Sequence, residues 1–296
     1  MSYRLSRRAM VSSALCALAG CSSLSTGLSD DPTPTIVAGT KSFDDLARLP
    51  PPNRRLDVAV FRFLDQTGQH KPNQTFADYS FAVTQGGTNL LIKALRDAGQ
   101  GSWFRVIERA NVADLMQERQ IIRANRIEYA GPNKEPLPEL APLLNAGLIL
   151  EGGIVGYDSN LLTGGVGANY LGIGASTQYS KDTVTVSLRS VSTLTGEVLT
   201  AVETSKTIYS VLFDGSVYRF VGFNRLLQAE AGFSTNEPVT ICVTQAIELA
   251  VYSTIMEGAL QHEWSFRDPA AQATLTQNYL EMRGDLASDP RLSKRP

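Results

Sequence analysis

Two stretches of the chain, residues 161–181 and 211–231, alternate small or polar residues with apolar and aromatic ones. Alternation with a period of two places the two kinds of side chain on opposite faces of a β-strand. Each stretch has room for two strands of roughly 9 to 11 residues, the length that a tilted strand needs to cross a bilayer. The pattern is clearest in Leu171, Ile173 and Ala175 against Gly172, Gly174 and Ser176, and in Val217, Arg219, Val221 and Phe223 against Tyr218, Phe220 and Gly222.

Four such strands cannot make a pore alone. Known transmembrane barrels begin at about eight strands, and an open sheet edge is not tolerated in lipid. The pattern therefore predicts two membrane hairpins per chain that join a barrel shared among subunits. Alternation alone fits glycine-rich surface hairpins of a soluble domain equally well, because the barrel signal of one segment is weak.

The N-terminus favours the membrane. Three arginines precede a short apolar run that ends in Leu18-Ala19-Gly20-Cys21. This is the layout of a bacterial secretory signal, and its last four residues resemble a lipobox. We expect residues 1–20 to be removed and Cys21 to carry covalent lipid (diacylglycerol and palmitate), while a plain signal peptide with an incidental cysteine is the alternative. Because Ser22 replaces the aspartate of an inner-membrane retention signal, the predicted location is the outer membrane.

The remainder predicts a mixed α/β unit. Residues 21–55 lack periodicity, are rich in Pro, Ser and Asp, and are interpreted as a tether. Period-two patterns predict strands at 56–64, 104–107 and 148–155, and a hairpin of 183–191 with 197–206. Period-3.6 patterns predict helices at 83–98, 112–122, 243–258 and 270–286, the second capped by Asn111. The predicted organisation is signal 1–20, tether 21–55, periplasmic α/β part 56–160, hairpins 161–181 and 211–231, periplasmic strands 182–210, periplasmic helix 232–264 and tail 265–296.

Composition excludes several classes of function. The 27 basic and 29 acidic side chains leave no charge excess for nucleic acid. No run of about 18 apolar residues is evident, so a membrane-spanning helix is not expected. Two histidines and three cysteines, without metal-ligand spacing, predict no metal site or disulfide framework. Neither Gly165-Val166-Gly167 nor Gly172-Ile173-Gly174 completes a nucleotide loop, and we find no catalytic constellation, so we predict no cofactor and no enzyme.

Several motifs, in order and spacing, resemble the curli secretion channel family CsgG. The likeness runs from the lipobox to about Trp264, which is nearly the whole mature chain. It fades in the tail. The motifs are Asp65-Gln66-Thr67-Gly68-Gln69 with Lys71-Pro72, Glu118-Arg119 with Ile121-Ile122-Arg123, Glu151-Gly152 with Gly156-Tyr157, Gly164-Gly165-Val166-Gly167-Ala168, Gly172-Ile173-Gly174-Ala175, Thr204-Ser205-Lys206-Thr207-Ile208, Arg225-Leu226-Leu227 and Asn236-Glu237-Pro238-Val239.

The resemblance implies an outer-membrane lipoprotein whose periplasmic α/β domains form a nonameric ring. Each subunit would lend two hairpins to one barrel, and nine subunits with four strands each give about 36 strands, the size of the largest known bacterial barrel. We take that barrel to be this family's own, so the ring size is implied by the resemblance and not by the residues. The implied function is ATP-independent, diffusive export of unfolded curli subunits, with a CsgE-like periplasmic adaptor and a CsgF-like surface factor as partners. The competing hypothesis is a periplasmic lipoprotein that binds envelope partners and makes no pore.

The resemblance also places the narrowest point of the pore in the loop 71–80. The family's constriction uses a Tyr, an Asn and a Phe. Matching backwards from Ser80, Tyr79 stands at the Phe position and Asp78 at the Asn position, while the Tyr position falls near Asn73 or Gln74 and Phe76 supplies a nearby ring. A ring of Asp78 carboxylates would favour cations. Without the resemblance, Phe76 and Tyr79 would more simply pack under the loop as local core.

Overall fold

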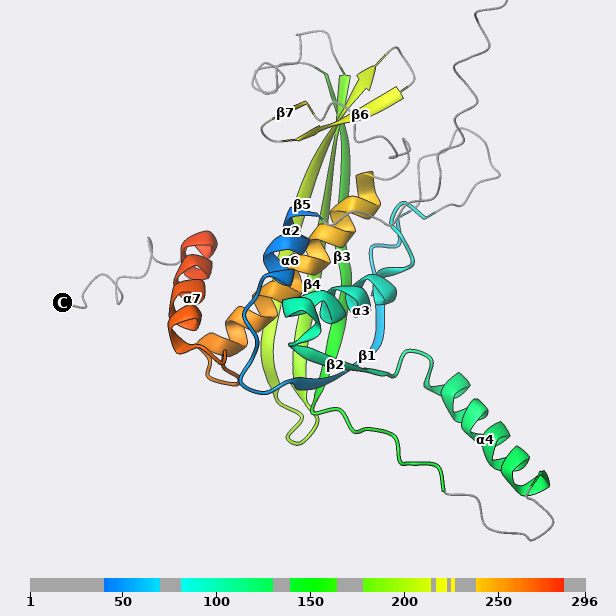
Figure 1. Ribbon diagram of the computed structural model, residues 1–296. Helices are drawn as coiled ribbons and strands as arrows, with labels where there is room; N and C mark the ends of the chain where they lie inside the picture. Colours follow the sequence, from blue (N-terminus) through cyan, green and yellow to red (C-terminus); the bar gives the residue numbers. More distant parts are fainter. Residues whose placement is uncertain are drawn as a thin grey trace, which may run out of the picture. The chain divides into compact units, whose positions relative to one another are not determined.

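The computed structural model describes residues 40–69, 81–129, 139–163, 178–213, 217–222, 225–226 and 238–284. A seven-stranded sheet with the order β2-β1-β3-β4-β5-β6-β7 runs through this part of the chain (Figure 1). The strands are β1 (Leu56–Asp65), β2 (Phe104–Glu108), β3 (Leu148–Thr163), β4 (Gln178–Ser192), β5 (Val198–Phe213), β6 (Val217–Gly222) and β7 (Arg225–Leu226). The mixed α/β prediction is confirmed.

The sheet is parallel at one side and antiparallel at the other. β1 pairs in parallel with β2 and β3, whereas β3, β4, β5 and β6 form successive antiparallel pairs. The predicted hairpin around Thr195-Gly196 is confirmed, because the Ser192 N–H donates to the Glu197 carbonyl at 2.8 Å. Both of its strands are longer than predicted, since the pairing of β4 with β5 continues to Tyr179 and Val211.

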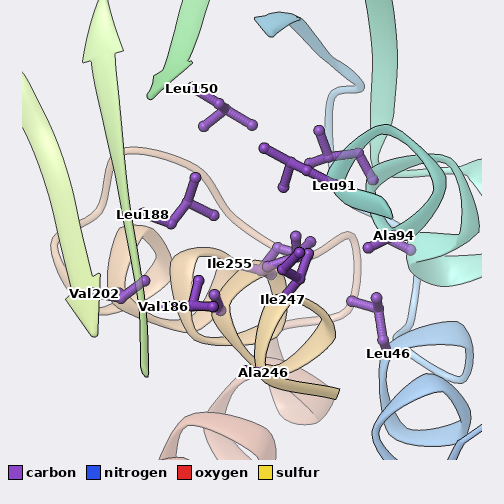
Figure 2. Packing of buried hydrophobic residues seen from close by; sticks show 14 of the residues in the cluster. Leu46, Leu91, Ala94, Leu150, Val186, Leu188, Val202, Ala246, Ile247 and Ile255 are labelled. Carbon is purple, nitrogen blue, oxygen red and sulfur yellow. The ribbon is translucent and has the colours of Figure 1, made fainter. Parts of the chain in front are cut away.

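Helices α2 (Lys41–Ala47), α3 (Gly87–Asp97) and α6 (Pro238–Leu260) gather against one face of the sheet (Figure 1). Their apolar side chains meet those of β1, β3, β4 and β5 in one core, which Figure 2 shows from close by. The predicted helices at 83–98 and 243–258 are therefore confirmed, although α3 begins at Gly87. Labelled members of the core include Leu46, Leu91, Leu150, Val186, Leu188, Ala246, Ile247 and Ile255.

Helix α6 corrects the expectation about membrane-spanning helices. Val239–Leu260 is long and apolar enough to cross a bilayer by length and composition, with a mean hydropathy of 1.5. However, 61% of this stretch is buried in the core, as is usual for a helix that is apolar all round. Burial, and not the absence of an apolar run, identifies α6 as a core helix.

The second half of the predicted tether also differs from expectation. Thr40 caps α2 by accepting a hydrogen bond from the Phe43 N–H at 3.0 Å, and Leu46 and Leu49 are buried. The indole of Trp103 donates to the Pro50 carbonyl at 2.9 Å. Residues 41–50 therefore belong to the folded core, and the few apolar residues among many polar ones explain why periodicity did not reveal them.

The C-terminal tail packs on α6. Helix α7 (Pro269–Arg283) confirms the predicted tail helix, and its Tyr279 donates to Glu257 of α6 at 2.8 Å. The approach to α7 is fixed by Trp264, whose indole donates to the Ile255 carbonyl at 2.8 Å. Gly258 is required here, because a Cβ at this position would lie inside the Trp264 ring.

Helix α4 (Val112–Glu128) forms where predicted but contributes nothing to the core, since none of its residues is buried. The expected cap is wrong: the Asn111 side chain makes no cap hydrogen bond, and the Asn111 N–H instead donates to Glu108 Oε1 at 2.9 Å. The Arg119 guanidinium donates to the Ala141 carbonyl at 2.7 Å, which ties the helix to the segment that follows it.

Candidate functional site

The candidate site lies at the carboxyl end of β1. Asp65 is the last residue of this strand and stands opposite Ile154 of β3. Its Oδ1 accepts from the Thr67 N–H at 2.9 Å and from the Thr67 hydroxyl at 2.7 Å, and its Oδ2 accepts from the Gln85 amide at 3.2 Å. An aspartate that bonds the backbone two residues on makes a tight Asx turn. Gly68 follows with φ of 64°, a left-handed conformation that glycine adopts without strain.

The two chain segments that leave this turn and return to it are bonded to each other. The Ala82 N–H donates to the Gln69 carbonyl at 2.9 Å, so residues 70–80 begin and end at the same point of the fold. Ala82 and Val83 are buried, which anchors the returning segment in the core. We call Asp65, Thr67, Gln69, Ala82 and Gln85 the loop base.

All the predicted site residues lie outside the described residues. Cys21 precedes residue 40, and Asn73, Phe76, Asp78 and Tyr79 fall within 70–80. The motif Asp65-Gln66-Thr67-Gly68-Gln69, which carried the resemblance, is the loop base in the structure. Its Asp-x-Thr-Gly pattern is a turn signal in its own right.

Three strands extend past this end of β1. From the pair Asp65–Ile154, β3 continues to Thr163, where it pairs with Gln178 of β4. β5 accompanies them as far as Phe213. Because β1 and β3 are parallel, the first predicted membrane hairpin continues from the same end of the sheet at which the loop base lies. Of that hairpin, the structure describes the pairs Leu161–Ser180, Leu162–Tyr179 and Thr163–Gln178.

The second predicted hairpin has a different layout. β5 ends at Phe213 and β6 begins at Val217, so the return between them lies near the start of the predicted segment 211–231 and not at its centre. The residues from Tyr209 to Phe213 pair with those from Val217 to Val221. The strand that enters this hairpin is therefore a direct continuation of the periplasmic strand, a continuity that alternation counted in separate windows did not detect.

A buried polar cluster lies where the strands leave the cover of α6. The Tyr157 hydroxyl donates to Asp182 Oδ1 at 3.2 Å, and both residues are buried. The Cys242 thiol of α6 lies 3.7 Å from the Asp182 carbonyl oxygen. Burial raises the pKa of Cys242 to about 12 and also raises the pKa of Tyr157, so both groups stay protonated at neutral pH. This cluster was not found by sequence reasoning, because its members come from three separate elements.

The outer face of the sheet, opposite α6, holds a groove of about 800 Å³. Exposed Phe61 and Val155 line it together with the ion pair between Arg189 and Glu151, whose N–O distance is 2.7 Å. Among the residues that the structure describes, no group of three or more His, Cys, Asp or Glu side chains is arranged to hold a metal. The described part of the chain thus presents strand ends, a loop base and an open sheet face.

Comparison with known proteins identifies the family. The family model "Curli production assembly/transport component CsgG" matches residues 39–282. The component of this name from Citrobacter koseri is 40% identical over 266 residues, which cover 89% of this chain and 93% of the relative. That of Escherichia coli K12 is 41% identical over 239 residues, 80% of this chain and 84% of the relative.

A solved structure, a dodecamer of a PelC variant from Paraburkholderia phytofirmans, covers 68% of this chain and 89% of its own chain at 12% identity. Its TM-score of 0.28 is too low to bear on the fold. The sequence relatives are decisive by themselves. The chain belongs to the CsgG family of curli production assembly/transport components.

Proposed function

We propose that this chain is a subunit of an outer-membrane secretion channel that exports unfolded curli-type amyloid subunits by ATP-independent diffusion. One observation carries the proposal. β3, β4 and β5 run beyond β1 and beyond the contacts of α6, toward two stretches with the alternation of transmembrane strands. A periplasmic binding module without a pore gains nothing from such extended strands.

The channel is a homo-oligomer in this proposal. Two hairpins per chain are too few for a closed barrel, and the subunit also carries apolar surface that its own core leaves uncovered. On α4, Met116, Ile121 and Ile127 are 39%, 45% and 80% exposed. A 17-residue helix with no buried side chain is marginal in water, so a neighbouring subunit is the natural source of its packing. The nonameric ring is supported by the family resemblance.

The narrowest passage is formed by the segment 70–80. Asn73, Phe76, Asp78 and Tyr79 would repeat around the ring, and the loop base holds both ends of this segment. Aromatic rings can contact an extended chain without reading its sequence, and a ring of Asp78 carboxylates favours cations. CsgE-like and CsgF-like proteins are the proposed partners, on the strength of the resemblance.

The subunit is held in the outer membrane through lipid on Cys21 and through its hairpins. A single acyl chain binds a membrane only marginally, so a permanent hold needs more than one chain or a second contact. We expect Cys21→Ser to leave the unassembled protein in the soluble periplasmic fraction. Outer-membrane sedimentation of this variant equal to that of the wild type would contradict lipidation at Cys21, unless its hairpins are already inserted.

The test of the function is an image of the detergent-extracted protein together with single-channel recording in a planar bilayer. A ring with a transmembrane collar and a steady conductance is expected. Tyr79→Ala and Phe76→Ala should raise the conductance, and Asp78→Asn should reduce cation preference. A compact particle without collar or conductance would instead support the periplasmic lipoprotein that binds envelope partners.

A further inference from the structure

The carboxylate of Asp65 has an unusual number of local partners for a residue at a strand end. It receives two hydrogen bonds from Thr67, on the segment that leaves β1, and one from Gln85, on the segment that returns to α3. The two oxygens thus divide their partners between the two sides of the loop. This carboxylate links both ends of residues 70–80.

The rest of the loop base extends this link. The Gln69 N–H donates to the Thr67 hydroxyl at 3.3 Å, and the Gln69 carbonyl accepts from Ala82 at 2.9 Å. Gln85 also donates to the Val83 carbonyl at 3.2 Å. On the strand side, the Gln66 N–H continues the ladder by donating to the Ile154 carbonyl at 2.9 Å. The ends of the segment are therefore fixed both to the sheet and to each other.

We propose that Asp65 is a positioning residue that holds the constriction at a fixed place by bonding both ends of residues 70–80. The inference rests on the proposed function, because it requires the constriction to lie in that segment. Side chains that define a passage must be held by a rigid support to keep one geometry. A charged acceptor makes stronger hydrogen bonds than a neutral one, which suits a carboxylate to this task.

The same strand offers a matched control. Asp57 lies near the opposite end of β1, where Arg105 donates to its two carboxylate oxygens at 2.6 and 2.5 Å. Replacing Asp57 by Ala therefore also removes a paired carboxylate from β1, but it leaves the loop base intact. Gln85→Ala is the second test variant, because it removes only the returning side of the link.

The experiment uses single-channel recording of the full, lipidated protein, with ring assembly checked by electron microscopy. Asp65→Ala and Gln85→Ala should lose the single conductance level and show several levels or excess open-channel noise. Asp57→Ala should retain the wild-type level. Combined with Tyr79→Ala, the Asp65 change should also reduce the conductance gain that Tyr79→Ala gives alone, a coupling that a merely structural role would not produce.

The outcomes separate this inference from the function on which it rests. If the wild type does not conduct, both fall. If Tyr79→Ala raises conductance while the Asp65 and Gln85 variants keep one wild-type level, the channel stands and the positioning role is rejected. If neither loop-base variant assembles a ring, Asp65 acts in folding and the positioning role is likewise rejected.

Discussion

Helices α6 and α4 both carry many apolar side chains, yet they differ completely in burial. Ile247, Val251 and Ile255 of α6 are at most 1% exposed, because β4 and β5 lie on one side of the helix and α2, α3 and α7 approach it from others. No residue of α4 is buried. The same kinds of side chain therefore serve two purposes: those of α6 stabilise the subunit, whereas those of α4 remain available to a neighbour.

The largest expected effect contrasts one isoleucine on each helix. Ile255→Ala should lower the free energy of unfolding by about 2 to 5 kcal/mol, because it leaves a cavity in a close-packed core. Ile127→Ala removes the same atoms from a side chain that is 80% exposed, and should change stability by less than about 0.5 kcal/mol. Urea unfolding followed by the fluorescence of Trp103 and Trp264, both buried, measures the two values. Equal losses would contradict the contrast between the helices.

The next effect concerns a charge inside the α6 core. Glu248 is 6% exposed and accepts a hydrogen bond from the Thr40 hydroxyl, while Lys93 and Asp97 of α3 also act on it. Burial is the largest cause that raises the pKa of Glu248 above its usual 4.5.

Because the folded state binds this proton more tightly than the unfolded state, Glu248 destabilises the fold at neutral pH. That penalty is absent below about pH 4.5, the unfolded value, and grows as pH rises through the raised folded pKa. Glu248→Gln should therefore show a smaller loss of stability between pH 4.5 and 7 than the wild type, in parallel urea titrations. Asp45→Asn, on the exposed side of α2, is the control and should keep the wild-type slope. Identical slopes for wild type and Glu248→Gln would refute the assignment.

How far the sequence predicts this molecule follows the same division. The core strands and helices were predictable because burial imposes periods of 2 and 3.6 on their residues. Helix α2 was not, since only Leu46 of its seven residues is buried and its docking depends on Thr40 and Glu248, which are more than 200 residues apart. The loop base was predicted only as a turn, because the partnership of Asp65 with Gln85 requires the chain to return across residues 70–80.

A smaller effect is expected where α7 joins α6. Tyr279→Phe removes the hydrogen bond to Glu257 but keeps the buried ring, so the loss should be about 1 kcal/mol in unfolding free energy. Burial raises the pKa of Tyr279 to about 12, with Glu257 adding to the shift, so the hydroxyl is a donor throughout the neutral range. Tyr279→Ala provides the comparison and should cost several times more. If Tyr279→Phe is as damaging as Tyr279→Ala, the ring contributes little and the hydrogen bond has been underestimated.

The smallest effect on subunit stability is expected on α4, and it is the sharpest test of why its apolar residues are exposed. Met116 and Ile127 are 11 residues apart, about three helical turns, and so lie on the same face. Met116→Asp and Ile127→Asp should each change the unfolding free energy of the subunit by less than about 0.5 kcal/mol, because neither side chain is buried. If a neighbouring subunit covers this face, the same charges must be desolvated on assembly, and the oligomer should be lost or weakened in native mass spectrometry. Leu194→Asp is the control, since Leu194 is 93% exposed in the turn between β4 and β5 and should leave assembly unchanged. Wild-type assembly of both α4 variants would separate the helix from the subunit interface, and the oligomer would then have to be held by other surfaces, such as the groove lined by Phe61 and Val155.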